Sequence, residues 1–180
     1  MALRTILLKG ESALRKKSRP LTSFNRRLHL LLDDMRETLA EVGGVGLAAP
    51  QVGILRRAVI VLETNVAEDE EDFLIELINP EIVETEGEQE GMEGCLSMPG
   101  ECGIVKRPMR VKLRAQDRNG EYFEIWGEGL TARAFCHETD HLDGVLFEER
   151  AEKMLTPEEL EEMDRKAAEA AEASEAQGEE

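Results

Sequence analysis

The segment Phe135–Leu142 constrains this chain most, because it places two histidines four residues apart with a glutamate between them. On a helix, His137 and His141 project from the same face, and Glu138 lies beside them. Such an HExxH pattern is typical of a catalytic metal site, in which the carboxylate takes a proton from metal-bound water. The alternative is a pair of histidines on a helix surface. We favour the metal site, because two of the chain's three histidines fall in this one pattern.

Length and composition bound the class of protein. A chain of 180 residues predicts one stable domain. No apolar run is long enough to cross a membrane, and the first ten residues do not form a secretory signal, so we expect a cytosolic protein. Three cysteines without CxxC spacing predict free thiols.

Charge is distributed unevenly along the chain. Residues 1–57 carry 11 lysines and arginines against 5 acids, whereas residues 58–105 carry 14 acids and no base. Residues 156–180 carry 10 acids against 2 bases, and the net charge is -17. This balance argues against a protein that grips nucleic acid by its overall charge, because phosphates are neutralised by lysine and arginine. We interpret the acidic regions as solvated surface.

Hydrophobic periodicity predicts one long amphipathic helix near the N-terminus, from Asn25 to about Glu41. Hydroxyls at Thr22 and Ser23 are expected to cap it, and glycines 43–44 to end it. The glycine-rich stretch 44–53 is predicted to be a loop. It lacks the lysine of a phosphate-binding loop.

Strands are predicted where short apolar or alternating runs are bounded by turn residues. They cover residues 58–62, 73–78, 82–85, 109–115 and 122–126. Asn79 and Pro80 are expected to close the second strand, and the last two strands are expected to form a hairpin. Residues 68–72 are expected to be an exposed loop.

The C-terminal region begins with Thr156, Pro157 and Glu159, a capping pattern that predicts a helix. No apolar stripe persists beyond Met163, so we expect the helix to fray after residue 167. The predicted organisation is a catalytic domain at 1–155 followed by an acidic, partly disordered helix or tail at 156–180.

A catalytic metal needs a third protein ligand besides the two histidines. One candidate is a glutamate from the run 158–162, and the other is Cys95. The glutamates stand in a run of interchangeable acids. Cys95 is the sharper choice, because its thiolate would donate charge to the metal.

Three separate stretches resemble the three motifs of bacterial-type peptide deformylases, in the family's order and with similar separations. They are residues 44–51, 93–97 and 137–141, with the sequences GVGLAAPQ, EGCLS and HETDH. The resemblance covers roughly residues 3–150. It implies an α+β fold, with mixed or antiparallel strands around a central metal-binding helix.

The resemblance also implies a reaction, the hydrolysis of the formyl group from N-formylmethionine at the start of newly made proteins, with release of formate. The implied metal ligands are Cys95, His137 and His141. Metal-bound water or hydroxide would attack the formyl carbonyl, with Glu138 as the general base. Gln51 and the backbone N–H of Leu96 would hold the developing oxyanion.

The implied substrate site surrounds this centre. Its residues are Val45, Gly46, Glu93, Gly94, Leu130, Arg133 and Ala134. The backbone at Val45 and Gly46 would form hydrogen bonds with the substrate backbone, so that the substrate lies like an additional strand. The methionine side chain would lie against Val45, Leu130 and Ala134, with Glu93 and Arg133 at the edge. Gly91 and Cys102 depart from the residues expected at their positions. Arg107 matches a structural arginine, for which we expect a salt bridge and no catalytic role.

The same resemblance implies one divalent metal per chain, with iron(II) as the native ion and zinc, nickel or cobalt as alternatives. The implied partners are nascent formylated polypeptides and, transiently, the ribosome, which the basic N-terminal third would contact better than the acidic tail. We expect no DNA binding, no membrane binding, a monomer, and a bacterial cytoplasmic location. Two alternatives stay open: an HExxH metallopeptidase with a tail glutamate as third ligand, and a catalytically silent homologue that binds N-termini.

Overall fold

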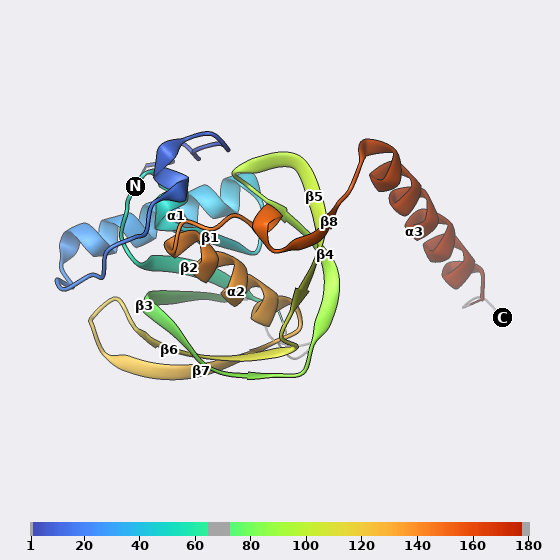
Figure 1. The fold of residues 1–180 in the computed structure, drawn as a ribbon. Coiled ribbons are helices and arrows are strands. Elements are labelled where there is room, and N and C mark those ends of the chain that lie inside the picture. The colour runs from blue at the N-terminus through green and yellow to red at the C-terminus, as the bar shows by residue number, and fades with distance from the viewer. Residues whose placement is uncertain (1, 65–72, 178–180) are drawn as a thin grey trace.

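The computed structural model describes residues 2–64 and 73–177, which form two antiparallel sheets and three α-helices (Figure 1). The first sheet has the order β1-β2-β3-β6-β7, and the second has the order β4-β5-β8. The first sheet comprises β1 (Gly46–Ala48), β2 (Ala58–Glu63), β3 (Phe73–Glu86), β6 (Arg110–Gln116) and β7 (Tyr122–Glu128). The second comprises β4 (Gln89–Cys95), β5 (Met98–Arg107) and β8 (Ala151–Met154). The helices are α1 (Arg26–Val42), α2 (Leu130–Leu142) and α3 (Pro157–Gln177). This confirms the predicted α+β class.

Helices α1 and α2 cover opposite faces of the five-stranded sheet, and α2 lies at the centre of the molecule with strands of both sheets around it (Figure 1). Strand β2 divides its side chains between the two faces. Val59 and Val61 pack in the core that contains Phe135 of α2, whereas Ala58 and Ile60 pack in the core of α1. A strand buried on both faces reads as a continuous apolar run, which is why its position was predictable.

The predicted helix near the N-terminus is confirmed as α1, but its predicted cap is wrong. The Asn25 side chain accepts a hydrogen bond from the Arg27 N–H at 3.0 Å, and Thr22 and Ser23 precede the cap. Asparagine is as good an N-cap as serine, so the residue that stands directly before the first helical turn takes this role. Gly43 ends the helix, as predicted, with φ at 72°.

The prediction that Asn79 and Pro80 close a strand is wrong. Strand β3 continues through them to Glu86, so the separate strand expected at residues 82–85 is its second half. Asn79 takes a left-handed φ of 52°, and the pairing with β6 shifts register between Ile78 and Glu81. The missing N–H of Pro80 costs little at such an irregularity. The Asn79 amide is held by both backbone groups of Leu21, each at 2.8 Å.

The glycine-rich stretch is more ordered than the predicted loop. It forms the edge strand β1, paired with β2, and then a 3-10 helix at Ala49–Val52. A three-residue strand between glycines carries too little periodic signal to be recognised in the sequence. The loop expected at residues 68–72 lies outside the described residues.

Strands β4 and β5 form a hairpin that the sequence analysis did not predict. Cys95 pairs with Met98, so Leu96 and Ser97 form the two-residue turn between the strands. The other hairpin, predicted from residues 109–126, is confirmed as β6 and β7.

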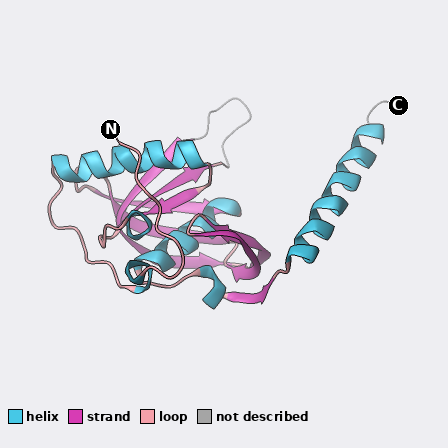
Figure 2. Ribbon diagram, turned by 90° about the horizontal axis from the view of Figure 1, so that it is seen from above, coloured by secondary structure: helices cyan, strands magenta, loops and turns pink. Residues whose placement is uncertain are grey.

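The C-terminal helix α3 stands away from the body of the molecule in both views (Figures 1 and 2). Thr156 and Glu159 make the predicted reciprocal cap, in which each side chain accepts a hydrogen bond from the other's backbone N–H. The helix runs to Gln177, further than the apolar pattern indicated. The partial disorder of this tail and the division at residue 155 stay predictions. Among the described residues, no helix is both long and apolar enough to span a membrane.

Candidate metal centre

The HExxH segment lies on α2 and is enclosed by the rest of the fold. His137, Glu138 and His141 are 9%, 4% and 1% exposed. Their burial follows from the position of α2, whose other side chains pack against the five-stranded sheet. The alternative of two histidines on a helix surface is therefore wrong.

Cys95 joins the two histidines, although it is 46 residues from His141 in sequence. Its Sγ lies 3.2 Å from His141 Nε2, and the ligand atoms of Cys95, His137 and His141 all lie within 4.8 Å of one another. Strand β4 ends at Cys95 and thereby presents the thiol to α2. The tail glutamates belong to α3, which points away from this centre (Figure 1), so they are not favoured as the third ligand.

These three residues fit a divalent transition metal. A tetrahedral ion bound by sulfur and nitrogen at about 2.0–2.3 Å holds its ligand atoms roughly 3.5 Å apart, which agrees with the spacing of the cluster. A thiolate with two imidazoles suits zinc, iron, nickel or cobalt and leaves a fourth position open. The cluster could therefore hold one catalytic ion.

Glu93 orients His137. The carboxylate contacts His137 Nδ1 at 3.0 Å, which directs the other ring nitrogen, Nε2, toward the ligand cluster. Arg107 donates to both carboxylate oxygens, at 2.9 and 3.0 Å, and Arg133 donates to one of them at 2.9 Å. Burial would raise the pKa of Glu93, but the contacts with His137 and Arg107 outweigh it and lower the pKa to about 2.

Asp140, inside the HExxH segment, anchors the other end of this network. Arg107 Nη1 donates to its carboxylate at 2.7 Å, and Arg150 donates to both of its oxygens. The expected salt bridge of Arg107 is thus confirmed. The sequence analysis did not assign a role to Asp140, although the acidic residue before His141 was visible in the motif.

The surroundings of the two histidines shift their pKa values in opposite directions. Burial lowers the pKa of His137, but the Cys95 thiol and the Glu93 carboxylate raise it further than burial lowers it. The pKa of His141 falls well below its usual value, because it is buried and faces positive charge on His137 and Arg107. A neutral His141 is the form that binds metals.

Glu138 is a buried carboxyl group with a near-neutral pKa. Burial raises its pKa to about 7, and its Oε2 atom has no hydrogen-bond partner among the described residues. A carboxylate whose pKa lies near the working pH can both accept and return a proton. Gly46 packs directly on it, because a Cβ atom at residue 46 would lie 2.6 Å from Glu138 Oε1.

Gln51 is buried at 1% exposure and fixed in orientation. Its Oε1 accepts a hydrogen bond from the Ala48 N–H at 2.8 Å, so its NH2 group points the other way, 3.6 Å from Cys95 Sγ. Gln51 is therefore part of the interior wall of the site and not a surface glutamine. A neutral donor beside the ligand cluster can hold developing negative charge.

A cavity of about 420 Å³ opens beside the cluster. Every residue that the sequence predicted for the site lines it, except His141, which lies behind the others. Two lining residues, Gly44 and Met92, were missed. Gly44 adjoins the predicted loop, but Met92 carried no signal because strand β4 was not recognised.

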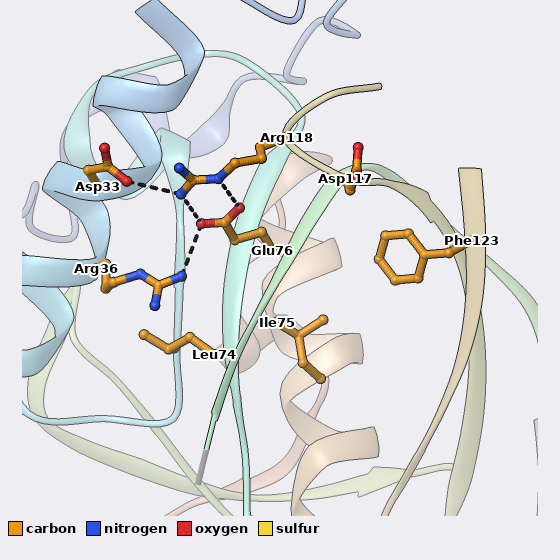
Figure 3. A pocket seen from close by; sticks show the side chains of 8 residues that line it. All are labelled: Asp33, Arg36, Leu74, Ile75, Glu76, Asp117, Arg118 and Phe123. Carbon is orange, nitrogen blue, oxygen red and sulfur yellow. Dashed lines mark hydrogen bonds and ion pairs between the residues drawn. The ribbon is translucent and has the colours of Figure 1, made fainter. Parts of the chain in front are cut away.

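A second hollow, of about 590 Å³, lies between α1 and the strands β3 and β7 (Figure 3). Its arginines, Arg36 and Arg118, both bind Glu76, and Arg118 also binds Asp33. These charges satisfy one another, and none of the lining residues belongs to the metal-ligand group. The hollow is therefore not a rival for the catalytic site.

Comparison with known proteins identifies the family. The family model described as polypeptide deformylase matches residues 3–156. The chain belongs to the polypeptide deformylase family. The peptide deformylase of Caldanaerobacter subterraneus subsp. tengcongensis is 54% identical over 161 residues, which cover 89% of this chain and 97% of that protein. That of Lachnoclostridium phytofermentans is 52% identical over 150 residues, covering 83% and 90%.

Solved structures of the family agree with this fold. The crystal structure of the peptide deformylase of Thermotoga maritima superposes with a TM-score of 0.77 at 39% identity, covering 84% of this chain and 99% of that one. A class I type b peptide deformylase from Acinetobacter baumannii, solved with Met-Ala-Ser bound, has a TM-score of 0.75 at 37% identity, covering 82% and 98%. The resemblance noted from three short motifs is thereby confirmed over most of the chain.

Proposed function

We propose that this chain is a peptide deformylase that hydrolyses the formyl group of N-formylmethionine at the start of new polypeptides and releases formate. Its family membership gives the reaction class, a metal-dependent hydrolysis. The observation that carries the proposal is the cluster of Cys95, His137 and His141 beside Glu138, at the wall of an open cavity. Cys95, His137 and Glu138 line the cavity, so a substrate amide can reach these three groups there.

The cavity suits an extended peptide that begins with methionine. Among the described strands, β1 pairs only with β2 and β4 only with β5, so each has a free edge, and Gly46 and Gly94 on these strands line the cavity. Free strand edges bind extended peptides through backbone hydrogen bonds. Val45, Leu130 and Ala134 provide an apolar surface for the first side chain. The relative from Acinetobacter baumannii, solved with Met-Ala-Ser bound, supports this choice.

The roles of the residues follow from their positions. A bound divalent ion would act as a Lewis acid and lower the pKa of water at the site. Glu138 takes the proton of the attacking water and returns it to the departing amine. Gln51 Nε2 and the backbone N–H of Leu96 stabilise the oxyanion, and one such donor is worth about 3 kcal/mol. Glu93 and Arg133 hold His137 in place from the cavity edge.

Several finer features belong to the same proposal. One divalent ion per chain, iron(II) in the cell, fits the sulfur and nitrogen ligands, with zinc, nickel or cobalt able to replace it. The enzyme works as a cytoplasmic monomer and meets nascent chains through a transient contact with the ribosome. The peptidase and the silent homologue are less well supported, because Cys95 supplies the third ligand and every expected catalytic group is present.

Formate release from a short N-formylmethionyl peptide tests the proposal directly. Protein purified without oxygen and loaded with iron(II) should release formate, whereas the Glu138→Ala variant should bind the metal but lose at least about a hundredfold in kcat, the lower range for a general base. Equal rates in the two proteins would remove Glu138 from its role. Metal bound at one per chain without formate release would support the silent homologue instead.

Gly46→Ala tests the positioning of that base. The new Cβ atom must push the Glu138 carboxylate away, and a displacement of about 1 Å at a catalytic group can cost roughly a hundredfold in rate. We expect kcat to fall while metal content stays at one per chain. A change in KM alone would mean that Gly46 serves only the substrate backbone.

A further inference from the structure

One end of this acidic molecule carries the described lysines and arginines that make no ion pair. Among the described residues, five lysines and arginines make no ion pair, whereas every other one contacts a carboxylate. The five are exposed, and we call them the basic stripe: Lys16, Arg19, Arg26, Arg27 and Arg56. Residues 12–32, which contain four of them, include no aspartate or glutamate, in a chain that has 39.

The backbone holds two of these arginines side by side. Arg19 and Arg56 are partners in an isolated parallel bridge, in which the Arg19 N–H donates to Leu55 O and the Arg57 N–H donates to Arg19 O. Like charges directly opposite each other destabilise paired strands. No described carboxylate forms an ion pair with either arginine, although Glu81 and Asp143 line a hollow with the neighbouring Pro20 and Arg57. A bound anion would relieve the repulsion between the two arginines.

The stripe lies far from the acidic C-terminal helix α3. Residues 16–27 lie on the left of the molecule and α3 on the right in both views (Figures 1 and 2). The segment also crosses the C-terminal end of α2, where the Ser18 N–H donates to Leu142 O. The cavity is lined by the earlier part of α2, up to Glu138. At about 0.1 M salt, charges separated by more than about 10 Å are largely screened, so α3 does not cancel the stripe.

We propose that the basic stripe binds the phosphodiester backbone of structured RNA and leaves the catalytic cavity open. Four of the five side chains are arginines, whose planar guanidinium groups match phosphate better than lysine does. Between residues 9 and 32, Leu30 is the one large apolar side chain that is exposed, at 43%. A single such side chain is too little to insert the stripe into a membrane. The choice of RNA over other polyanions rests on the proposed function, because nascent chains emerge from an assembly built largely of RNA.

The test is the fluorescence anisotropy of a labelled 20-base-pair RNA duplex of arbitrary sequence (roughly two turns, enough to span the stripe), titrated with the full-length protein at low and moderate salt. We expect weak, sequence-independent binding that declines steeply with salt. Arg19→Gln/Arg56→Gln should weaken it about tenfold and reduce the salt slope by roughly 2. Arg26→Gln/Arg27→Gln provides an independent second variant at the other end of the stripe.

Arg114→Gln/Lys153→Gln is the matched control, because it removes the same charge from two exposed residues outside the stripe that already have carboxylate partners. It should leave RNA binding within about twofold. Equal weakening by control and stripe variants, or no binding by the parent at low salt, would overturn the proposal. Stripe-dependent binding to phosphatidylserine vesicles but not to RNA would make the surface a membrane contact. Formate release should be unchanged in all variants, so failure of the deformylase assignment is recognised separately.

Discussion

Two carboxylates in this protein, Glu93 and Glu76, are each held by two arginines, yet their surroundings differ. Around Glu93, the side chains of Arg107 and Arg133 are 6% and 8% exposed. Around Glu76, those of Arg118 and Arg36 are 31% and 48% exposed (Figure 3). The first network ends on His137 of the candidate metal centre, and the second ends at an open hollow.

Burial decides whether an ion-pair network holds its side chains in fixed positions. Charges removed from water must be fully paired, so the positions around Glu93 are rigidly defined and can orient His137. Charges that keep water contact gain little from pairing and tolerate other arrangements. We therefore expect the Glu93 network to support catalysis and the Glu76 network to tie α1 to β3 without affecting the reaction.

Glu93→Ala should have the largest effect. It leaves the buried guanidinium groups of Arg107 and Arg133 without their shared partner, which should reduce the free energy of unfolding by about 3–5 kcal/mol. Loss of the contact to His137 should also weaken metal binding roughly 10- to 100-fold. Denaturant unfolding and metal competition titrations measure the two effects. Unchanged metal affinity in a folded variant would remove the orienting role of Glu93.

Glu76→Ala is the counterpart in the exposed network. We expect it to lower the free energy of unfolding by about 1 kcal/mol, because its arginine partners remain hydrated. Metal affinity and kcat/KM should not change. A loss as large as that of Glu93→Ala would mean that exposure does not distinguish the two networks.

Acid should reveal the Glu76 contribution separately. Burial would raise the pKa of Glu76, but hydrogen bonds from Arg118 and Arg36 lower it below its usual value. A carboxylate with a lowered folded-state pKa stabilises the fold above its unfolded pKa of about 4.5 and loses that effect as pH falls. The stability difference between the parent and Glu76→Gln should thus shrink from pH 6 to pH 3. A difference that grew in acid would contradict the sign of this shift.

Salt should give the smallest effect. At 1 M salt the Debye length is about 3 Å, so the stability difference between the parent and Arg36→Gln should fall by a few tenths of a kcal/mol. The pair of Glu93 and Arg107 is shielded from ions, so the destabilisation by Glu93→Ala should not respond. Denaturant titrations in urea at two salt concentrations provide the measurement. Equal salt sensitivity of the two variants would show that ions reach the buried network.

Much of the fold could be predicted where a local hydrophobic pattern dictates the secondary structure. The helix α1, the apolar strand β2 and the hairpin of β6 and β7 all carry periodic signals over several residues. The pattern failed where pairing depends on distant partners. Strand β3 passes through Asn79 and Pro80 because β6 and Leu21 hold it there, and β4 is half glycine and acid.

The chemistry expected of the site could be inferred from short segments of the sequence. The spacing of His137 and His141 follows from the helical repeat, so two ligands and a base could be assigned without any tertiary contact. Cys95 was preferred as the third ligand for its thiolate, and the motif resemblance supported it and added Gln51. Their side chains are distant in sequence from α2, so no local rule could place them.

How these groups are arranged around one another depends on the tertiary fold. It placed Cys95 Sγ 3.2 Å from His141, packed Gly46 against Glu138, and showed that the Glu93 carboxylate is occupied by Arg107, Arg133 and His137. It also separated the unpaired cations from the acidic helix. These features depend on distances between segments far apart in the chain, and burial, which sets the pKa values and the strength of each ion pair, exists only after the chain has folded.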